Sequence, residues 1–114
     1  MDRSKYRSAN IYMSSAIVLH LVNSAPVQSW TFASEEVIHI GRATDNNVVL
    51  FSAVVSRHHA ELRWNDTTGW EISNMSANGT YIEGEAIKSA PIADGTIFRL
   101  ATSGPRIEAK IKEL

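Results

Sequence analysis

Polar side chains are concentrated in the stretch VVSRHHAEL, residues 54–62, where an alternation of apolar and polar residues begins. The stretch supplies a hydroxyl, a guanidinium and two adjacent imidazoles, from Ser56, Arg57, His58 and His59. A guanidinium forms charge-assisted hydrogen bonds to phosphate oxygens, and a hydroxyl donates to the same acceptors. These residue types predict a binding site for a phosphate group rather than a catalytic centre.

Two further polar clusters lie at predicted strand–loop boundaries. One is IGR, residues 40–42, and the other is NMSANGT, residues 74–80. Such boundaries gather at the ends of a β-sandwich, where binding loops collect. Arg42 would then add a second guanidinium to the site. Asn78 would offer both a donor and an acceptor, which suits the backbone of a peptide ligand.

The elements that must position these loops are short strands. Apolar and polar residues alternate in six segments, residues 16–22, 29–33, 59–64, 70–73, 96–100 and 106–111, as in half-buried strands. Turn residues separate them, and RWNDTTGW, residues 63–70, is predicted to be a hairpin with a tryptophan in each arm. No stretch longer than about 12 residues carries a helical apolar stripe, so we predict an all-β antiparallel sandwich or barrel.

Length and composition describe one globular domain. The chain has 114 residues, 44% hydrophobic and 20% charged, with a formal net charge of −1 and no cysteine, so it can bury a single core and forms no disulfide. It lacks the broad basic field that non-specific nucleic-acid binding needs. It also lacks an apolar run near the roughly 20 residues that span a bilayer. We therefore expect no nucleic-acid partner, no membrane association and a cytoplasmic location.

The order of the three polar clusters resembles the forkhead-associated (FHA) domain family. The motifs are Gly41-Arg42, then Ser56-Arg57-His58-His59, then Ser76-Ala77-Asn78-Gly79-Thr80, with Asp94-Gly95 trailing. Each fragment alone is weak, whereas the ordered set is highly specific. The resemblance implies an FHA/SMAD-like, two-sheet antiparallel β-sandwich of about eleven strands. We expect residues 1–13 to be a flexible leader and residues 14–114 to form the domain.

The resemblance also implies recognition of phosphothreonine in a partner protein or peptide, without catalysis, cofactor or metal. By position, Arg42 and Ser56 would contact the phosphate, and Arg57 would add a second cation there. Asn78 would hydrogen-bond the ligand backbone, and Ala77 lies in the same binding loop. The positions assigned to structural support of the site are Gly41, His59, Ser76, Gly79 and Thr80. We expect a monomer, and the chain is compatible with being part of a longer multidomain protein.

Three positions depart from the usual family pattern. Asn74 stands where aspartate is frequent, Ala77 where a hydroxyl sometimes helps to bind the ligand, and Glu83 where asparagine is common in a turn. Glu83 would repel phosphate if it lay near the cleft. Ala77 and Glu83 motivate an alternative function, a protein-interaction scaffold of the same fold that does not depend on phosphate.

Other chemistries have less support in the sequence. A hydrolase centred on Ser56 is a second alternative, but no Gly-x-Ser-x-Gly elbow and no acid partner are evident. Adjacent strand residues point to opposite faces, so His58 and His59 cannot simply chelate one metal ion together with His39. We expect instead a buried, hydrogen-bonded imidazole at His59 and a solvent-facing one at His58.

Two simpler interpretations concern the arginine and the aromatic residues. Arg57 could be an ordinary surface charge paired with Glu61 or Glu83, although the surrounding pattern favours phosphate binding. The tryptophans are most simply core or hairpin packing rather than a stacking platform for nucleic acid; they are Trp30, Trp64 and Trp70. No phosphate-binding P-loop and no dinucleotide glycine pattern occurs, so no nucleotide cofactor is expected.

Overall fold

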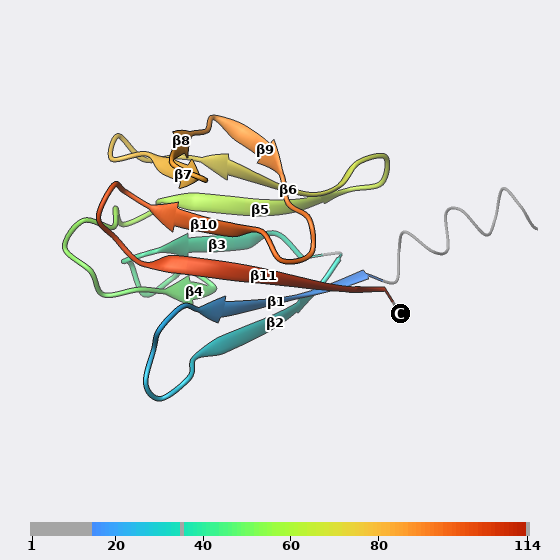
Figure 1. Ribbon diagram of the computed structural model, residues 1–114, viewed down its shortest axis with the longest axis horizontal. Coiled ribbons are helices and arrows are strands. Elements are labelled where there is room, and N and C mark those ends of the chain that lie inside the picture. Colours follow the sequence, from blue (N-terminus) through green and yellow to red (C-terminus); the bar gives the residue numbers. More distant parts are fainter. Residues whose placement is uncertain (1–14, 35, 114) are drawn as a thin grey trace, which may run out of the picture.

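The computed structural model describes residues 15–34 and 36–113, which form two stacked β-sheets (Figure 1). The secondary structure within these ranges is entirely β, with eleven strands. The predicted two-sheet sandwich is therefore confirmed. The predicted leader, residues 1–13, lies outside the described residues. The described part of the chain contains no helix suited to crossing a membrane.

One sheet has six strands in the order β2-β1-β11-β10-β7-β8. Their bounds are β1 (Ser15–Leu21), β2 (Ser29–Ala33), β7 (Thr80–Ile82), β8 (Glu85–Ala86), β10 (Ile97–Leu100) and β11 (Arg106–Glu113). All neighbouring strands in this sheet run antiparallel. It is the more continuous of the two layers, because β1 and β11 are the longest neighbouring strands and pair over seven residues.

The other sheet has five strands in the order β4-β3-β5-β6-β9. Their bounds are β3 (Ile38–Gly41), β4 (Val48–Val49), β5 (Ala60–Asn65), β6 (Gly69–Asn74) and β9 (Ser89–Pro91). One short pair departs from the antiparallel pattern, since β3 and β4 run parallel with Ile40 opposite Val48. The intervening loop returns along β3, and the Asn47 N–H donates to the His39 carbonyl at 2.9 Å.

The core lies between the inner faces of the sheets. In the six-stranded sheet, Leu19 lies opposite Ala109, and both are fully buried. The five-stranded sheet contributes an opposing set of buried side chains: Ile38, Ile40, Leu62, Trp70 and Ile72. Full burial of one such aliphatic side chain is worth about 1.5–3 kcal/mol relative to exposure, so the alternation seen in the sequence stabilises the sandwich.

The predicted tryptophan hairpin is formed by β5 and β6. Trp64 lies opposite Trp70 in the register, and the two rings meet edge to face with centroids 5.7 Å apart. Trp70 is buried in the core, while Trp64 and Trp30 are half-buried and pack against it. The packing interpretation of the tryptophans is therefore confirmed.

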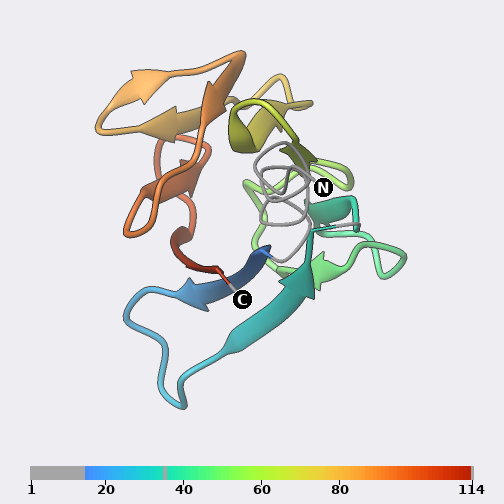
Figure 2. The ribbon, with the colours of Figure 1, turned by 90° about the vertical axis from the view of Figure 1, so that its right-hand side faces the viewer.

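The three loops predicted to hold the site lie at the same end of the sandwich (Figure 1). They are the β3–β4, β4–β5 and β6–β7 loops, and the β5–β6 hairpin turn lies at the opposite end. Figure 2 views the molecule from that opposite end and shows the two sheets as facing layers. Loops that are far apart in the sequence are thus brought together at one end.

Candidate functional site

Gly41 is where the β3–β4 and β4–β5 loops meet. A Cβ added to Gly41 would lie 2.2 Å from the backbone oxygen of Arg57, a distance that real Cβ atoms essentially never show. The closeness is fixed by backbone hydrogen bonds, because the Arg42 N–H donates to the Ser56 carbonyl at 2.9 Å and the Ala43 N–H to the Arg57 carbonyl at 3.1 Å. Glycine at this position therefore allows Arg42 to lie directly beside Ser56.

The Arg42 side chain is exposed and partly anchored. Its Nε donates to the Val55 carbonyl at 3.0 Å. That bond uses only the Nε–H of the guanidinium, so the Nη donors can bind another acceptor. The side chain is thus pre-oriented next to Ser56, which reduces the conformational entropy lost when an anion binds.

The Ser56 hydroxyl lies against a hydroxyl from a different loop. Its Oγ is 2.6 Å from the Oγ of Ser76, which is buried and also accepts the Asn78 N–H at 3.0 Å. If Ser76 donates to Ser56, no buried donor is left unpaired, an outcome that avoids a cost of about 1–3 kcal/mol. The Ser56 proton is then available to an incoming acceptor.

Asn78 connects the β6–β7 loop to the β4–β5 loop. Its Nδ2 donates to the Val54 carbonyl at 2.9 Å, while the side chain remains exposed. The carbonyl Oδ1 has no partner among the residues the structure describes. The amide therefore holds two loops together and keeps an acceptor, and one remaining N–H, for a ligand.

Arg57 and Ala77 are the two predicted ligand-binding residues without a side-chain bond inside the described ranges. Both are exposed. The alternative pairing of Arg57 with Glu61 is not observed, since Glu61 pairs with Arg63 instead. The backbone of Arg57 is nevertheless fixed, because its carbonyl accepts from Ala43 N–H and from Asn46 Nδ2 at 2.7 Å. Its side chain is exposed and has no ion pair within the described ranges.

His59 is fully buried beneath these loops. Its Nδ1 accepts the Ser56 N–H at 3.0 Å, and its Nε2–H donates to the Gly79 carbonyl at 2.7 Å. Burial lowers the pKa of His59 below its ordinary value, with the bond to Gly79 acting in the opposite direction. A neutral imidazole protonated at Nε2 therefore joins two binding loops, and this geometry supports the bracing role predicted for it.

Two asparagines complete the loop end, and neither was predicted to have a role in the site. Asn74 accepts the Thr80 hydroxyl at 2.8 Å and the Ser76 N–H at 3.2 Å, and its Nδ2 donates to the Ser76 carbonyl at 3.0 Å. An aspartate could not make the last bond, so the departure at position 74 is accommodated by an extra hydrogen bond. Asn46 donates to both the Ala43 and Arg57 carbonyls. The turn-forming residues Asp45-Asn46-Asn47 indicate a loop but not these hydrogen-bond partners.

His39 and His58 each lie near a carboxylate. His58 is exposed and its Nε2 lies 3.1 Å from Asp45, while His39 Nδ1 lies 3.7 Å from Glu61. The described residues contain no group of three or more His, Asp or Glu side chains placed to hold a metal ion. The exposed position predicted for His58 and the buried one predicted for His59 are both confirmed.

The geometry around Ser56 lacks the features of a nucleophile. The His59 imidazole accepts the backbone N–H of Ser56, whereas the Ser56 hydroxyl contacts Ser76. A serine nucleophile needs its hydroxyl within hydrogen-bond reach of a base. Within the described ranges no imidazole reaches that hydroxyl, so the arrangement favours binding an anion over hydrolysis.

Glu83 lies away from the binding loops. It follows β7, which leads from Thr80 at the loop end of the sandwich toward the opposite end, and it is exposed. Glu83 and Gly84, with φ of 51° and 80°, form the two central residues of the tight turn between β7 and β8. Its charge is therefore not in a position to repel a phosphate at Ser56.

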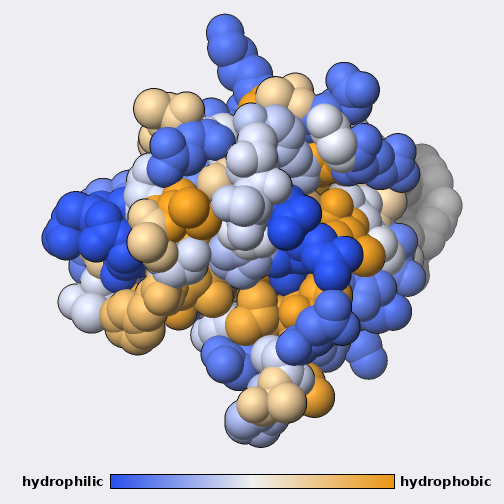
Figure 3. Space-filling view, turned by 60° about the vertical axis from the view of Figure 1, so that its left-hand side comes forward, coloured by the Kyte–Doolittle hydropathy of each residue, from blue (hydrophilic) through white to orange (hydrophobic). Residues whose placement is uncertain are grey.

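The surface at the loop end mixes strongly hydrophilic and apolar patches. Figure 3 brings this end forward, and blue patches lie directly beside orange ones. Phe51 in the β4–β5 loop and Met75 in the β6–β7 loop are exposed large hydrophobic residues. The end of the sandwich can thus contact both the charged and the apolar parts of a peptide.

Comparison with known families places this geometry in context. The sequence profile of the FHA domain matches residues 38–101, which is more than half of the chain. The chain belongs to the FHA domain family. The matched region contains every site residue predicted from the sequence.

Two mycobacterial proteins resemble this FHA domain in sequence. The ABC transporter ATP-binding/permease protein Rv1747 of Mycobacterium tuberculosis is 41% identical over 64 residues, covering 55% of this chain and 7% of that protein. The transcriptional regulatory protein EmbR of M. tuberculosis is 45% identical over 64 residues, covering 54% of this chain and 16% of EmbR. The chain therefore corresponds to a small part of each relative.

Solved structures of FHA domains share the architecture. One, from a study of phosphothreonine-dependent FHA domain interactions, superimposes with a TM-score of 0.75 at 25% identity, covering 87% of this chain and 99% of that one. M. tuberculosis EmbR in complex with a low-affinity phosphopeptide gives a TM-score of 0.71 at 29% identity, covering 87% and 25%. The structural likeness thus covers more of the chain than the region that the profile matches.

Proposed function

We propose that this FHA domain is a phosphothreonine-dependent protein-binding module. The partner's phosphothreonine docks in extended form across loops 41–47, 53–58 and 74–79. The observation that carries the proposal is the position of the Ser56 hydroxyl, 2.6 Å from Ser76, in a loop that also contains Arg57 and is hydrogen-bonded to the backbone of Arg42. A dianion needs charge-assisted donors that converge with little reorganisation, and we infer that Arg42, Ser56 and Arg57 supply them here.

Each predicted ligand residue has a distinct part in this proposal. Arg42, Ser56 and Arg57 bind the phosphate, and Asn78 binds the ligand backbone beside it. Ala77 is in the same loop as Asn78 and adds no hydroxyl group to the site. Gly41, His59, Ser76, Gly79 and Thr80 keep the loops in place. No step of bond making or breaking is proposed.

Relatives supply independent support for a phosphorylated ligand. EmbR has been captured with a phosphopeptide, and the FhaA FHA domain with the intracellular domain of Rv3910, the latter at 25% identity and a TM-score of 0.71. Both are complexes with peptide or protein. We extend the same class of ligand to this chain, as residues 14–114 acting in the cytoplasm as a monomer.

A peptide panel tests this function. A phosphothreonine peptide selected from a degenerate library is compared by calorimetry with its phosphoserine and unmodified versions. We expect micromolar binding of the phosphothreonine form, about −8 kcal/mol. The phosphoserine form should bind more weakly by about 0.8 kcal/mol or more, the transfer value of one methyl group. Equal binding of the unmodified peptide would instead favour the phosphate-independent scaffold that Ala77 motivates.

The Arg57→Ala variant tests how much the Arg57 guanidinium contributes to phosphopeptide binding. We expect the variant to lose about 1.5–3 kcal/mol of binding free energy for the phosphothreonine peptide, the range for a charged hydrogen bond. Arg63→Ala is a matched control, because Arg63 is equally an exposed arginine but pairs with Glu61 on β5. The role given to Arg57 is wrong if both variants bind the peptide like the native chain.

A further inference from the structure

Two arginines lie side by side on the outer surface of the six-stranded sheet. Arg99 on β10 lies directly opposite Arg106 on β11 in the antiparallel register. Their chain neighbours Phe98, Leu100 and Ile107 are fully buried, so both arginines lie on the outer face. Like charges opposite one another on neighbouring strands destabilise a sheet. Neither arginine has a carboxylate within ion-pair distance in residues 15–34 and 36–113.

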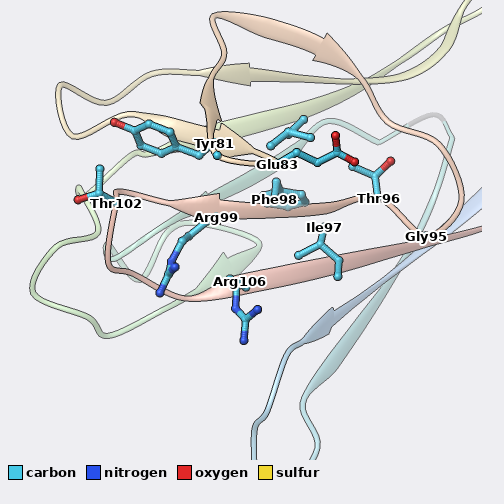
Figure 4. A pocket seen from close by; sticks show the side chains of 11 residues that line it. Tyr81, Glu83, Gly95, Thr96, Ile97, Phe98, Arg99, Thr102 and Arg106 are labelled. Atoms are coloured by element: carbon cyan, nitrogen blue, oxygen red, sulfur yellow. The ribbon is translucent and has the colours of Figure 1, made fainter.

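Arg99 is fixed in position by the loop that joins the two strands. Its Nε donates to the Gly104 carbonyl at 2.9 Å. Gly104 is itself closely packed, because an added Cβ would lie 2.0 Å from the Leu100 carbonyl oxygen. Among the residues that the structure describes, the Nη donors of Arg99 have no acceptor, and Arg106 is exposed beside it. Figure 4 shows the two side chains projecting in the same direction from adjacent strands.

A surface hollow of about 590 Å³ is lined by both arginines. Its floor is partly apolar, and Ile97 remains 41% exposed there. The nearest carboxylate on β11, Glu108, pairs with Lys110 at 3.5 Å. Glu83 lines the hollow on the side away from the two arginines (Figure 4). The arginine side of the hollow therefore carries unneutralised positive charge next to apolar surface.

The hollow begins close to the proposed phosphothreonine site. The Ala101 N–H donates to the Gly79 carbonyl at 2.8 Å, and Gly79 adjoins Asn78. Arg99 precedes Ala101 by two residues, which corresponds to about 7 Å along a strand. Tyr81 lines the hollow as well, and its hydroxyl would lie 2.9 Å from a Cβ on Gly79. One partner can thus reach both places with a few extended residues.

We propose that Arg99 and Arg106 form a second anion-binding site, for an acidic segment of the same phosphorylated partner. The inference rests on the proposed phosphothreonine function. Carboxylates or a further phosphate on that segment accept hydrogen bonds from the Nη groups of both arginines, and an apolar neighbour covers Ile97. Linking two sites in one partner raises affinity without any change at the first site.

Calorimetry with paired peptides tests the second site. One probe is a phosphothreonine peptide with alanine flanks, and the others add a Glu-Leu-Glu-Glu segment at either end through a Gly-Ser spacer. The extension at one end should tighten binding about tenfold, as one or two charge-assisted hydrogen bonds would. Replacing its glutamates with phosphoserine should keep the gain, and replacing them with glutamine should abolish it.

Charge-reversal variants test whether the tighter binding of the extended peptide depends on Arg106. Arg106→Glu should abolish it while leaving the alanine-flanked peptide unaffected. Lys112→Glu is the matched control, because Lys112 is also exposed on β11 and undergoes the same change of charge outside the hollow. Arg106→Gln serves as a milder second variant. Equal gain in the Arg106 and Lys112 variants, or no gain in the native chain, would overturn the proposal.

A separate titration distinguishes failure of this site from failure of the phosphothreonine site. The Glu-Leu-Glu-Glu peptide alone, without phosphothreonine, is added to the ¹⁵N-labelled native chain. Amide shifts at Ile97, Arg99 and Arg106 are expected even if the alanine-flanked phosphopeptide does not bind. Absence of these shifts at millimolar peptide would refute the second site regardless of what happens at Ser56.

Discussion

The two ends of the sandwich close in different ways. At the β5–β6 hairpin turn, the side-chain bonds are local, as Asn65 Oδ1 accepts from Thr67 N–H and Thr68 N–H, two and three residues away. The loop end also has local bonds, but others there join residues 20 or more apart, as between Ser56 and Ser76 and between His59 and Gly79. The hydrogen bonds at the hairpin end can form within one turn, whereas those at the loop end require the distant segments of the fold to be in place.

The difference has an energetic meaning. Local turns satisfy exposed backbone groups at little cost. The loop end instead buries polar side chains, including His59, Ser76 and Thr80, each of which needs a partner to avoid a desolvation penalty. A network of this kind favours one arrangement of the loops and therefore positions Arg42 and Ser56 before a ligand arrives.

The largest expected effect is that of Gly41→Ala. The new Cβ would collide with the Arg57 backbone, so we expect a loss of about 4 kcal/mol in the free energy of unfolding. Gly69→Ala in the hairpin is the control, because its Cβ would have room and only its φ of 86° is unfavourable, costing about 1–2 kcal/mol. Urea unfolding measures both. A milder effect at Gly41 than at Gly69 would contradict the proposed difference between the two ends.

His59→Ala should be the next most damaging change. It removes the acceptor for the Ser56 N–H and the donor to Gly79, and it leaves a buried cavity, so we expect a loss of about 3 kcal/mol. His58→Ala, next in the sequence but exposed, should change stability by no more than about 0.5 kcal/mol. Thermal unfolding distinguishes the two. Unchanged stability with lost phosphopeptide binding would assign His59 to the ligand instead of the fold.

His59 also predicts how stability depends on pH. Burial lowers its pKa in the folded state below the ordinary 6.5, so the unfolded chain takes up a proton first as the pH falls. Its contribution is complete above pH 6.5 and is lost progressively as the pH falls from there toward the folded-state pKa. His59→Gln should flatten this part of the stability profile, measured by urea unfolding between pH 7.5 and 5. Identical slopes in both proteins would show that other groups cause the dependence.

The smallest expected effect lies in the β7–β8 turn, away from both binding loops and core. Glu83 adopts a φ of 51°, which asparagine tolerates better, and Asn-Gly is the preferred pair for such a turn. Glu83→Asn should stabilise the fold by about 0.5–1 kcal/mol. Binding of the alanine-flanked phosphopeptide should not change. A clear gain in that affinity would place the Glu83 charge closer to the ligand than the fold indicates.

Sequence reasoning found the long strands because their alternation is a property of the chain itself. Residues 59–64 and 106–111 are predicted segments that β5 and β11 contain almost entirely. The two- and three-residue strands β4, β7, β8 and β9 are too short for a period of two to be visible. The parallel pairing of β4 with β3 is fixed by loop contacts, which no local pattern encodes.

The candidate site was predictable in its residues more than in its connections. The ordered motifs identified Arg42, Ser56, Arg57 and Asn78, and the fold brings their loops together. The roles of Asn46 and Asn74 depend on partners up to eleven residues away, so their residue types alone could not reveal them. The pairing of Arg99 with Arg106 could have been predicted from the sequence, because the register of a hairpin formed by β10 and β11 places the two residues opposite each other.

A ¹H–¹⁵N NMR titration of the native chain with the alanine-flanked phosphothreonine peptide tests most directly whether the loops of the proposed site bind the phosphopeptide. We expect the largest amide shifts at Arg42, Ser56, Arg57 and Asn78, and none of these shifts with the unphosphorylated peptide. Shifts of equal size from the unphosphorylated peptide, or shifts confined to the β5–β6 hairpin end, would contradict this expectation.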